Sequence, residues 1–347
     1  MVRFWKKKQF WGGLIGLILL AFCIKDIRLQ ELRGLLSQLD PVALALSIIA
    51  SFVFVILRGL RYKLVVSQQS RLPFIRSITL YSAGQALNTI MPALTGQVGR
   101  LILFARKIGL RKTYIFSTII LEILFDAISL IIFVLMASLA FPFPDRYRFI
   151  GYIIAGATVA LLVLLYALLH FQKGMEEFGR RRMRDRWPGA YITVKKFIRS
   201  FAKGIETLRS SQYLAGSMIY SLLAWTVHMM AIYFLFLAFG FDISFVGAAV
   251  LMIINTLVLL IPITPGNAGT FEVAVSTSLA AFRVGRTDAV LFALALHFID
   301  ILPMFVLGLW FVHAERLSLR KISREHEDEV IYRRISEEGA FIEEETV

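Results

Sequence analysis

Long apolar segments separated by short polar ones are the dominant pattern along this chain. A helix of about 20 apolar residues, at about 1.5 Å rise per residue, crosses roughly 30 Å of hydrocarbon. Six segments have this character, at residues 9–26, 41–63, 113–139, 149–171, 213–239 and 287–313. The pattern therefore predicts an all-α polytopic membrane protein with six full transmembrane helices.

Two further apolar segments, 74–91 and 243–264, contain polar residues and run into prolines. Each is followed by a helical piece, 98–108 or 271–283, that is too short to cross a membrane. We predict two re-entrant helical hairpins whose turns are buried in protein or line a wet cavity, because loop backbone facing lipid would leave its polar groups unpaired. Whether 243–264 is instead a full span stays open.

A pattern of polar residues and glycines occurs twice. The thirteen-residue step from Thr113 to Asp126 recurs from Thr287 to Asp300. We interpret this as an internal duplication with halves at about 41–139 and 213–313, and breakable backbone at corresponding places of two halves is typical of a transporter's binding site. The other matched positions are Asn88 with Asn255, Thr89 with Thr256, Gly96 with Gly266, and Gly99 with Gly269.

Composition agrees with a membrane protein. The chain has 347 residues, 58% hydrophobic and 18% charged, which excludes a water-soluble globular domain. Its net charge of +14 does not indicate nucleic-acid binding, because Lys and Arg cluster in short segments beside apolar runs. The single cysteine, Cys23, excludes an intramolecular disulfide and a cysteine-based zinc site. No signal-peptide cleavage pattern follows the first apolar segment, so we expect an uncleaved span.

The distribution of basic residues predicts the orientation. Lys6, Lys7 and Lys8 place the N-terminus in the cytoplasm, and the loop 172–212, with eleven basic and four acidic residues, is cytoplasmic as well. The charged tail 314–347 follows a single transmembrane domain at 1–313 and is also expected inside. Span 41–63 then runs inward and 213–239 outward, so the halves are inverted repeats. We expect a multi-pass protein of the plasma (inner) membrane with both termini cytoplasmic.

Two acidic residues lie within a predicted span. Glu122 and Asp126 are four residues apart and share one helix face. An ionised acid at a helix centre costs about 2.5–3.5 kcal/mol, so the pair should face the protein interior. It would act as a relay for a proton or cation, as a counter-charge for a headgroup, or as a hydrogen-bonded clamp between helices. In each case the neutral variant Asp126→Asn is expected to fold normally.

His297 and Asp300 form a matching polar spot in the second half, which His228 could join. A relay role is expected for His297 and Asp300. A His–Asp–His metal site is the less favoured alternative, because lone histidines in helix bundles are usually packed and hydrogen-bonded, so we expect no metal. The common intramembrane hydrolase motifs are absent, and no catalytic residue is predicted.

Arginines near the predicted hairpins suggest an anion receptor. Arg58 and Arg61 are spaced i to i+3, and Arg100 follows the first G-x-x-G. Guanidinium groups bind phosphate through parallel hydrogen bonds, although cytoplasmic arginines also serve simply as membrane anchors. The remaining residues of the predicted substrate site lie in the two hairpins: Asn88, Gly96, Gln97, Gly99, Asn255, Pro265, Gly266, Asn267, Gly269 and Glu272.

Four segments together suggest a family: R-G-L-R-Y from Arg58, N-T-I-M-P-A-L-T-G-Q-V-G-R from Asn88, L-E-I-L-F-D from Leu121 and I-T-P-G-N-A-G-T-F-E from Ile263. Over residues 10–313 the chain resembles flippase-like membrane proteins related to the transmembrane region of bacterial lysylphosphatidylglycerol synthase. It departs from their usual pattern with Gln97 in place of Glu and Ile123 in place of Arg. The second departure is expected to remove the nearest partner of Glu122.

The resemblance implies lipid handling. The residues after 313 are too few for the soluble aminoacyl-transfer domain of the synthase, so transport is expected and not lipid synthesis. We predict that an anionic phospholipid or lipid-linked substrate is bound or moved between leaflets, without cofactor or nucleic acid. The acids Glu122, Asp126, Glu272 and Asp300 would hold a cationic headgroup or a coupling proton. Alternatives are an intramembrane lipid-modifying enzyme and a scaffold for a cytoplasmic lipid- or glycosyl-transferase; a homo-oligomer is left open.

Overall fold

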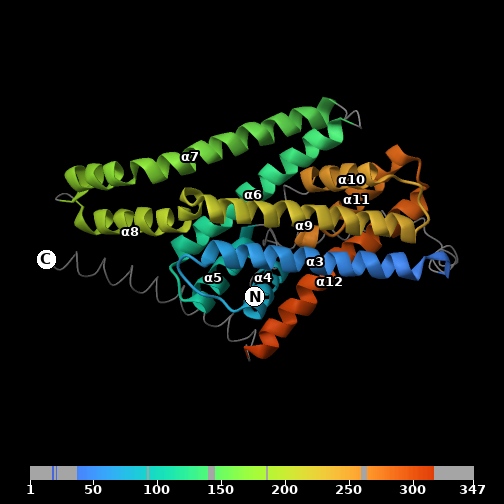
Figure 1. Cartoon of the computed structure of the whole chain (residues 1–347), viewed down its shortest axis with the longest axis horizontal. Coiled ribbons are helices and arrows are strands. Elements are labelled where there is room, and N and C mark those ends of the chain that lie inside the picture. Colours follow the sequence, from blue (N-terminus) through green and yellow to red (C-terminus); the bar gives the residue numbers. More distant parts are fainter. Residues whose placement is uncertain are drawn as a thin grey trace, which may run out of the picture.

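The computed structural model describes residues 18, 21, 37–91, 94–139, 145–184, 187–258 and 264–315. Every regular element in these ranges is a helix, which agrees with the predicted all-α class (Figure 1). The predicted first span 9–26 lies almost wholly outside the described residues, as do Cys23, Pro92, Pro262 and the tail beyond residue 315.

Five helices are long and apolar enough to cross a membrane, and they coincide with five of the six predicted spans. Asp40 begins the first of them, because its Oδ1 accepts the Val42 backbone N–H at 2.8 Å and Pro41 occupies the first helical position. The five are α3 (Pro41–Val66), α6 (Lys112–Ser138), the Tyr152–Met183 part of α7 (Asp145–Met183), α9 (Ser211–Ala238) and α12 (Arg286–Ala314).

The basic segment 172–212, expected to be a cytoplasmic loop between two spans, is mostly helical. Helix α7 continues past the predicted span end at residue 171 to Met183, about 18 Å further at 1.5 Å per residue. Helix α8 (Pro188–Gly204) then returns beside it, and η2 (Glu206–Arg209) leads into α9 (Figure 1). Arg199 of α8 donates to Glu176 of α7 at 2.7 Å, which ties the two arms of this hairpin together.

The four short helices occupy the predicted hairpin segments. They are α4 (Phe74–Ile90), α5 (Leu94–Ile108), α10 (Phe245–Val258) and α11 (Thr270–Leu279), with the 3-10 turn η3 (Pro265–Asn267) before α11. The longest, α4, has 17 residues, or about 25 Å, which is short of the hydrocarbon thickness. Each pair, α4 with α5 and α10 with α11, packs together.

One expectation about the first hairpin is wrong. The G-x-x-G of Gly96 and Gly99 was expected at its turn, but both glycines lie within α5. Gly96 instead allows α5 to approach α4 closely, because a Cβ at this position would lie 2.7 Å from the Cα of Asn88. In the second half, by contrast, Gly266 and Gly269 have φ values of 60° and 82° and do form a turn.

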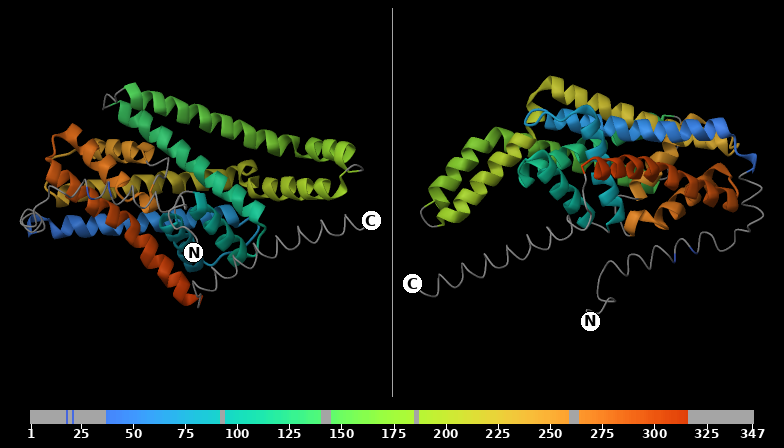
Figure 2. Two further views of the ribbon diagram at one scale, coloured as in Figure 1. Left: turned by 180° about the vertical axis from the view of Figure 1, so that it is seen from behind. Right: turned by 90° about the horizontal axis from the view of Figure 1, so that it is seen from below.

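Helices α3 and α9 run antiparallel through the centre of the molecule (Figures 1 and 2). The Ser47 hydroxyl of α3 donates to the Ala231 carbonyl of α9 at 2.8 Å, and towards the other end of α3 Arg61 contacts Ser221. The last helix of each predicted half packs on the first short helix of the other: α12 packs on α4, and α6 packs on α10. The order long, short, short, long occurs in both halves.

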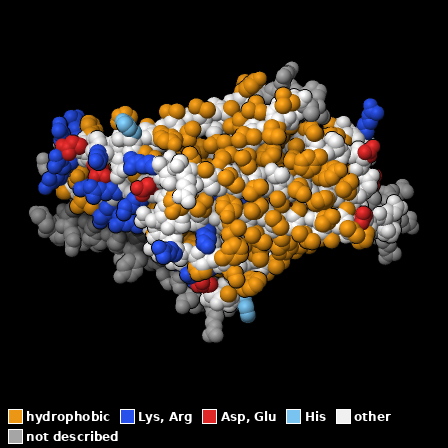
Figure 3. All heavy atoms as spheres, in the orientation of Figure 1, with side chains coloured by type: hydrophobic (Ala, Val, Ile, Leu, Met, Phe, Trp, Pro, Cys, Tyr) orange, Lys and Arg blue, Asp and Glu red, His pale blue; other side chains and the backbone are white. Residues whose placement is uncertain are grey.

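The surface has the character of a membrane protein. Figure 3 shows a broad apolar band across the bundle, with Lys and Arg gathered at the end that carries the α7–α8 hairpin. Large apolar side chains exposed on the surface include Val42, Ile49, Leu135 and Leu309. Soluble monomers rarely expose a continuous apolar area of this kind, so the protein is integral to a membrane.

Candidate functional site

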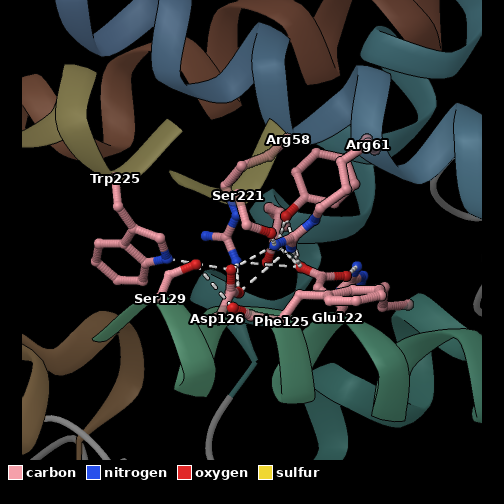
Figure 4. A network of polar contacts seen from close by, with 11 residues as sticks. Arg58, Arg61, Glu122, Phe125, Asp126, Ser129, Ser221 and Trp225 are labelled. Carbon is pink, nitrogen blue, oxygen red and sulfur yellow. Dashed lines mark hydrogen bonds and ion pairs between the residues drawn. The ribbon is translucent and has the colours of Figure 1, made fainter. Parts of the chain in front are cut away.

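The arginines of α3 meet the acids of α6 inside the bundle (Figure 4). Arg58 Nη2 lies 2.5 Å from Asp126 Oδ2 and 3.1 Å from Glu122 Oε1. Arg61 Nη1 lies 2.5 Å from Asp126 Oδ1. Arg100, from the first turns of α5, donates to Glu122 Oε2. Because Arg58 and Arg61 share one face of α3 and the two acids share one face of α6, these i to i+3 and i to i+4 pairs interlock. We refer to these five residues as the arginine cluster.

Neutral side chains of α4 and α9 add hydrogen bonds to the two acids and to Arg61. Tyr81 donates to Glu122 Oε1 at 2.7 Å, and Gln85 donates to the Tyr81 hydroxyl at 2.6 Å. Trp225 Nε1 donates to Asp126 Oδ1 at 3.2 Å, and Ser221 accepts from Arg61 Nη1 at 2.6 Å. Each pair lies four residues apart on one helix, α4 or α9. Polar residues at this spacing within an apolar helix are the sequence signal that could have identified them.

The arginine cluster carries an excess positive charge. Three guanidinium groups face two carboxylates, so one positive charge has no counterpart in the cluster. The least buried members are Arg58 and Asp126, with side chains 17% and 18% exposed. The Nε atoms of Arg58 and Arg100 are buried and have no hydrogen-bond partner among the described residues. Buried donors in this state are rare in proteins and favour an external acceptor.

The cluster corrects one expectation and refines another. Glu122 does not lack a partner, because it contacts Arg58, Arg61 and Arg100. The side chain of Ile123 is 54% exposed, so this position lies at the surface and not within the buried cluster. The arginines expected to form a phosphate receptor do converge, but their terminal nitrogens already face the two acids.

A second polar cluster lies at the turn of the other half. His297 Nδ1 is 2.7 Å from Glu272 Oε1, and its Nε2 is 3.0 Å from the Gly266 carbonyl oxygen. Glu272 Oε2 accepts the Gly269 backbone N–H at 2.6 Å, which caps the start of α11. The ring of Phe271 stacks on His297 with centroids 4.4 Å apart. His297 and Glu272 therefore clamp the turn between them.

Asp300 and His228 lie near this clamp without joining it. His228 Nδ1 is 3.7 Å from Asp300 Oδ1, and neither atom has a hydrogen-bond partner among the described residues. Both ring nitrogens of His297 are already engaged, so it has no lone pair to share with His228 at a metal. Within the described ranges no group of three or more His, Cys, Asp or Glu could hold a metal ion.

The other predicted hairpin residues surround the meeting point of the two halves. The turn η3 packs on α4, and a Cβ at Gly266 would lie 3.5 Å from Thr89 Cγ2. Asn267 adopts φ 56°, a left-handed conformation that Asn tolerates. The side-chain oxygens of Asn255, Asn267 and Gln97 are buried without partners in the described structure. Pro265 begins η3, and Gly99 lies one residue before Arg100.

Comparison with known proteins finds similar membrane proteins. A UPF0104 membrane protein of Pyrococcus horikoshii is 22% identical over 304 residues, covering 82% of this chain and 90% of the relative. A UPF0104 membrane protein of Methanothermobacter thermautotrophicus is 23% identical over 285 residues, covering 75% of this chain and 81% of the relative. No solved structure matches the chain. The family profile described as lysylphosphatidylglycerol synthase TM region matches residues 9–308, and the chain belongs to that family.

Proposed function

We propose that this protein binds an anionic lipid headgroup at the arginine cluster and moves the lipid between the two leaflets. The observation that carries the proposal is the buried excess of one positive charge among Arg58, Arg61, Arg100, Glu122 and Asp126. A headgroup phosphate with one negative charge would balance it. A buried ion is costly unless it is compensated, so the cluster favours such a ligand.

The geometry of the cluster indicates how a phosphate could replace Asp126 as a partner of Arg58. Asp126 holds both Arg58 and Arg61 and is itself among the most accessible groups of the cluster. A phosphate that approaches Arg58 would take over part of the bonding that Asp126 now provides, and the unpaired Nε of Arg58 adds a donor. Arginine suits this role because its planar fork forms parallel bonds to phosphate oxygens.

The helix arrangement supports an inverted-repeat transporter with two re-entrant hairpins, α4–α5 and α10–α11. The helices α3 and α9, which occupy equivalent positions in the two halves, run antiparallel. The packing of α12 on α4 is equivalent to that of α6 on α10. The turn of the second hairpin, η3, contacts helix α4 of the first. The basic α7–α8 hairpin and both termini would lie in the cytoplasm, and the membrane would be the plasma membrane.

The test is reconstitution of the purified protein in sealed liposomes that carry a trace of fluorescent phosphatidylglycerol or phosphatidylcholine. A membrane-impermeant quencher added outside reports how fast inner-leaflet lipid becomes accessible. We expect the protein to accelerate the anionic lipid more than the zwitterionic one. Lipid exchange no faster than in protein-free liposomes would rule the proposal out.

A matched pair of variants tests the cluster itself. Arg58→Lys keeps the charge but loses the planar fork, and the rate should fall about tenfold, the factor expected for one lost charge-assisted hydrogen bond. The control Arg76→Lys makes the same change in a half-exposed ion pair with Glu315 and should transport like the unmodified protein. Equal rates for both variants would remove Arg58 from the binding site.

A scaffold role is the second candidate, and the shape of the α7–α8 hairpin favours it. Trp187, Ile192, Val194 and Phe197 are exposed along the hairpin beside its basic residues. A surface that combines aromatic and cationic groups fits a membrane surface or a partner such as a cytoplasmic lipid- or glycosyl-transferase. Deletion of the hairpin that leaves lipid exchange intact but abolishes co-purification of a transferase would support this role.

A further inference from the structure

The hydrogen bonds of His297 determine how many protons it shares with Glu272. Its Nε2 lies 3.0 Å from the Gly266 carbonyl oxygen, which can only accept, so Nε2 carries a hydrogen. Its Nδ1 lies 2.7 Å from Glu272 Oε1. Two arrangements satisfy this contact: an imidazolium that donates to a carboxylate, or a neutral imidazole that accepts from a carboxylic acid.

Both arrangements hold one proton more than a neutral histidine beside an ionised glutamate. Without that proton only one ring nitrogen carries a hydrogen, so a bare lone pair would face either the Glu272 carboxylate or the Gly266 carbonyl oxygen, and one of the two contacts would be lost. Glu272 is 3% exposed, and its other oxygen is bound to the Gly269 N–H at 2.6 Å. The carboxylate cannot turn away without releasing that cap. The proton is therefore part of the clamp on the turn at residues 264–269.

We propose that Glu272 and His297 form a proton-binding site whose occupancy locks the η3 turn. Loss of the proton would break one of the two His297 contacts, to Glu272 or to the Gly266 carbonyl, and so free the turn, which packs on α4 beside Thr89. The site would thereby couple a proton to the movement of lipid, a role that rests on the function proposed above. Glu122 and Asp126 are less suited to carry that proton, because arginines hold both.

Few charged or titratable groups lie near the site among the described residues. Asp300 lies three residues further along α12, and His228 of α9 lies 3.7 Å beyond it. From α4, Thr89 meets the turn. Within the described part of the chain, Asp300 Oδ1 and His228 Nδ1 have no hydrogen-bond partner, so these two residues offer a route along which a proton could reach or leave His297.

One substitution imitates the occupied site. In Glu272→Gln, the amide oxygen can accept the Gly269 N–H while the amide nitrogen donates to His297 Nδ1. This variant keeps both hydrogen bonds of the clamp but has no carboxyl group to ionise. The matched control is Glu315→Gln, the same chemical change in a half-exposed ion pair at the end of α12.

The test follows the accessibility of the turn in detergent between about pH 5 and pH 8, the range in which histidine ordinarily titrates. A cysteine is placed at the turn by Ala268→Cys, in a background with Cys23→Ser, and its maleimide labelling rate is divided by that of the exposed reference Gln69→Cys. This ratio removes the effect of pH on the thiol itself. In otherwise unmodified protein we expect the ratio to rise about tenfold with pH, the factor expected for one lost charge-assisted hydrogen bond.

Glu272→Gln should hold the ratio at its low-pH value throughout, and Glu315→Gln should follow the unmodified protein. A flat ratio in the unmodified protein, or an undiminished rise in Glu272→Gln, overturns the proposal. If Glu272→Gln does not fold, the pH dependence of the labelling ratio in protein that retains Glu272 still tests the proposal. Because no lipid is moved in detergent, failure of lipid exchange in liposomes and failure of this proton site are separate results.

Discussion

Neutralising Asp126 should strongly destabilise the protein, contrary to what a buried acid alone would indicate. Asp126 accepts from Arg58 and Arg61 at 2.5 Å each and from Trp225 at 3.2 Å. Asp126→Asn leaves three buried guanidinium groups facing Glu122 alone, so the excess charge rises from one to two. Removing one partner of a buried ion pair costs about 3–5 kcal/mol. We expect about 3 kcal/mol, because the Asp126 side chain is 18% exposed.

A double variant separates charge imbalance from loss of packing. Adding Arg58→Gln to Asp126→Asn returns the excess charge to one, as in the unmodified cluster. The loss of stability in the double variant should therefore be smaller than the sum of the two single losses by at least about 1 kcal/mol, since groups in one ion-pair network couple by amounts of this order.

The measurement is reversible unfolding in mixed detergent micelles, followed by circular dichroism. Glu315→Gln is the control, because it breaks a half-exposed pair with Arg76, and such pairs contribute about 0–1 kcal/mol. If Asp126→Asn unfolds at the same detergent fraction as Glu315→Gln, then the ion pairs of the cluster do not stabilise the fold, and the reasoning from buried charge is refuted.

Three further substitutions test single contacts by the same unfolding measurement. Gly96→Ala should cost about 1–3 kcal/mol through overpacking, whereas Gly174→Ala, with no atom near its added Cβ, should be neutral or stabilising; equal effects would contradict the close approach. Asn267→Ala should cost about 1 kcal/mol because of its positive φ, and Asn267→Gly should not; an unaffected alanine variant would argue against that backbone conformation. Trp225→Phe should cost about 1.5–3 kcal/mol by removing one hydrogen bond to Asp126, and an unchanged midpoint would show that this bond contributes nothing.

The hydrophobic pattern predicted the long helices well because length and apolarity alone decide whether a helix can cross a membrane. It failed beyond residue 171, where α7 continues through polar residues as far as Met183. Local composition does not reveal that the extension packs against α8 and is tied to it by Arg199 and Glu176. The two G-x-x-G motifs look alike in sequence, yet only the second adopts positive φ values, because glycine permits such a turn without requiring it.

The candidate site was predictable residue by residue but not in its pairing. Arg58, Arg61, Arg100, Glu122 and Asp126 all stand out as charged residues near or within apolar segments. Their mutual compensation depends on how α3, α5 and α6 approach one another, which sequence spacing does not determine. The acids and arginines were therefore assigned separate roles, although each is the other's nearest counter-charge.

The pairing of α3 with α6 has a consequence for biosynthesis. Arg61 leaves the ribosome 65 residues before Asp126, the residue that later holds it. Because the ribosome adds roughly 5–20 residues per second, about 3–13 s pass between the synthesis of Arg61 and that of its counter-charge.

During that interval its two arginines cannot rest in lipid without a penalty of about 2.5–3.5 kcal/mol each at the membrane centre. Helix α3 should therefore remain in a hydrated part of the insertion machinery, or shallow in the bilayer, until α6 has been made. In ribosomes arrested before residue 126, a cysteine placed in α3 should accordingly react with a water-soluble maleimide, whereas after α6 has emerged it should be protected.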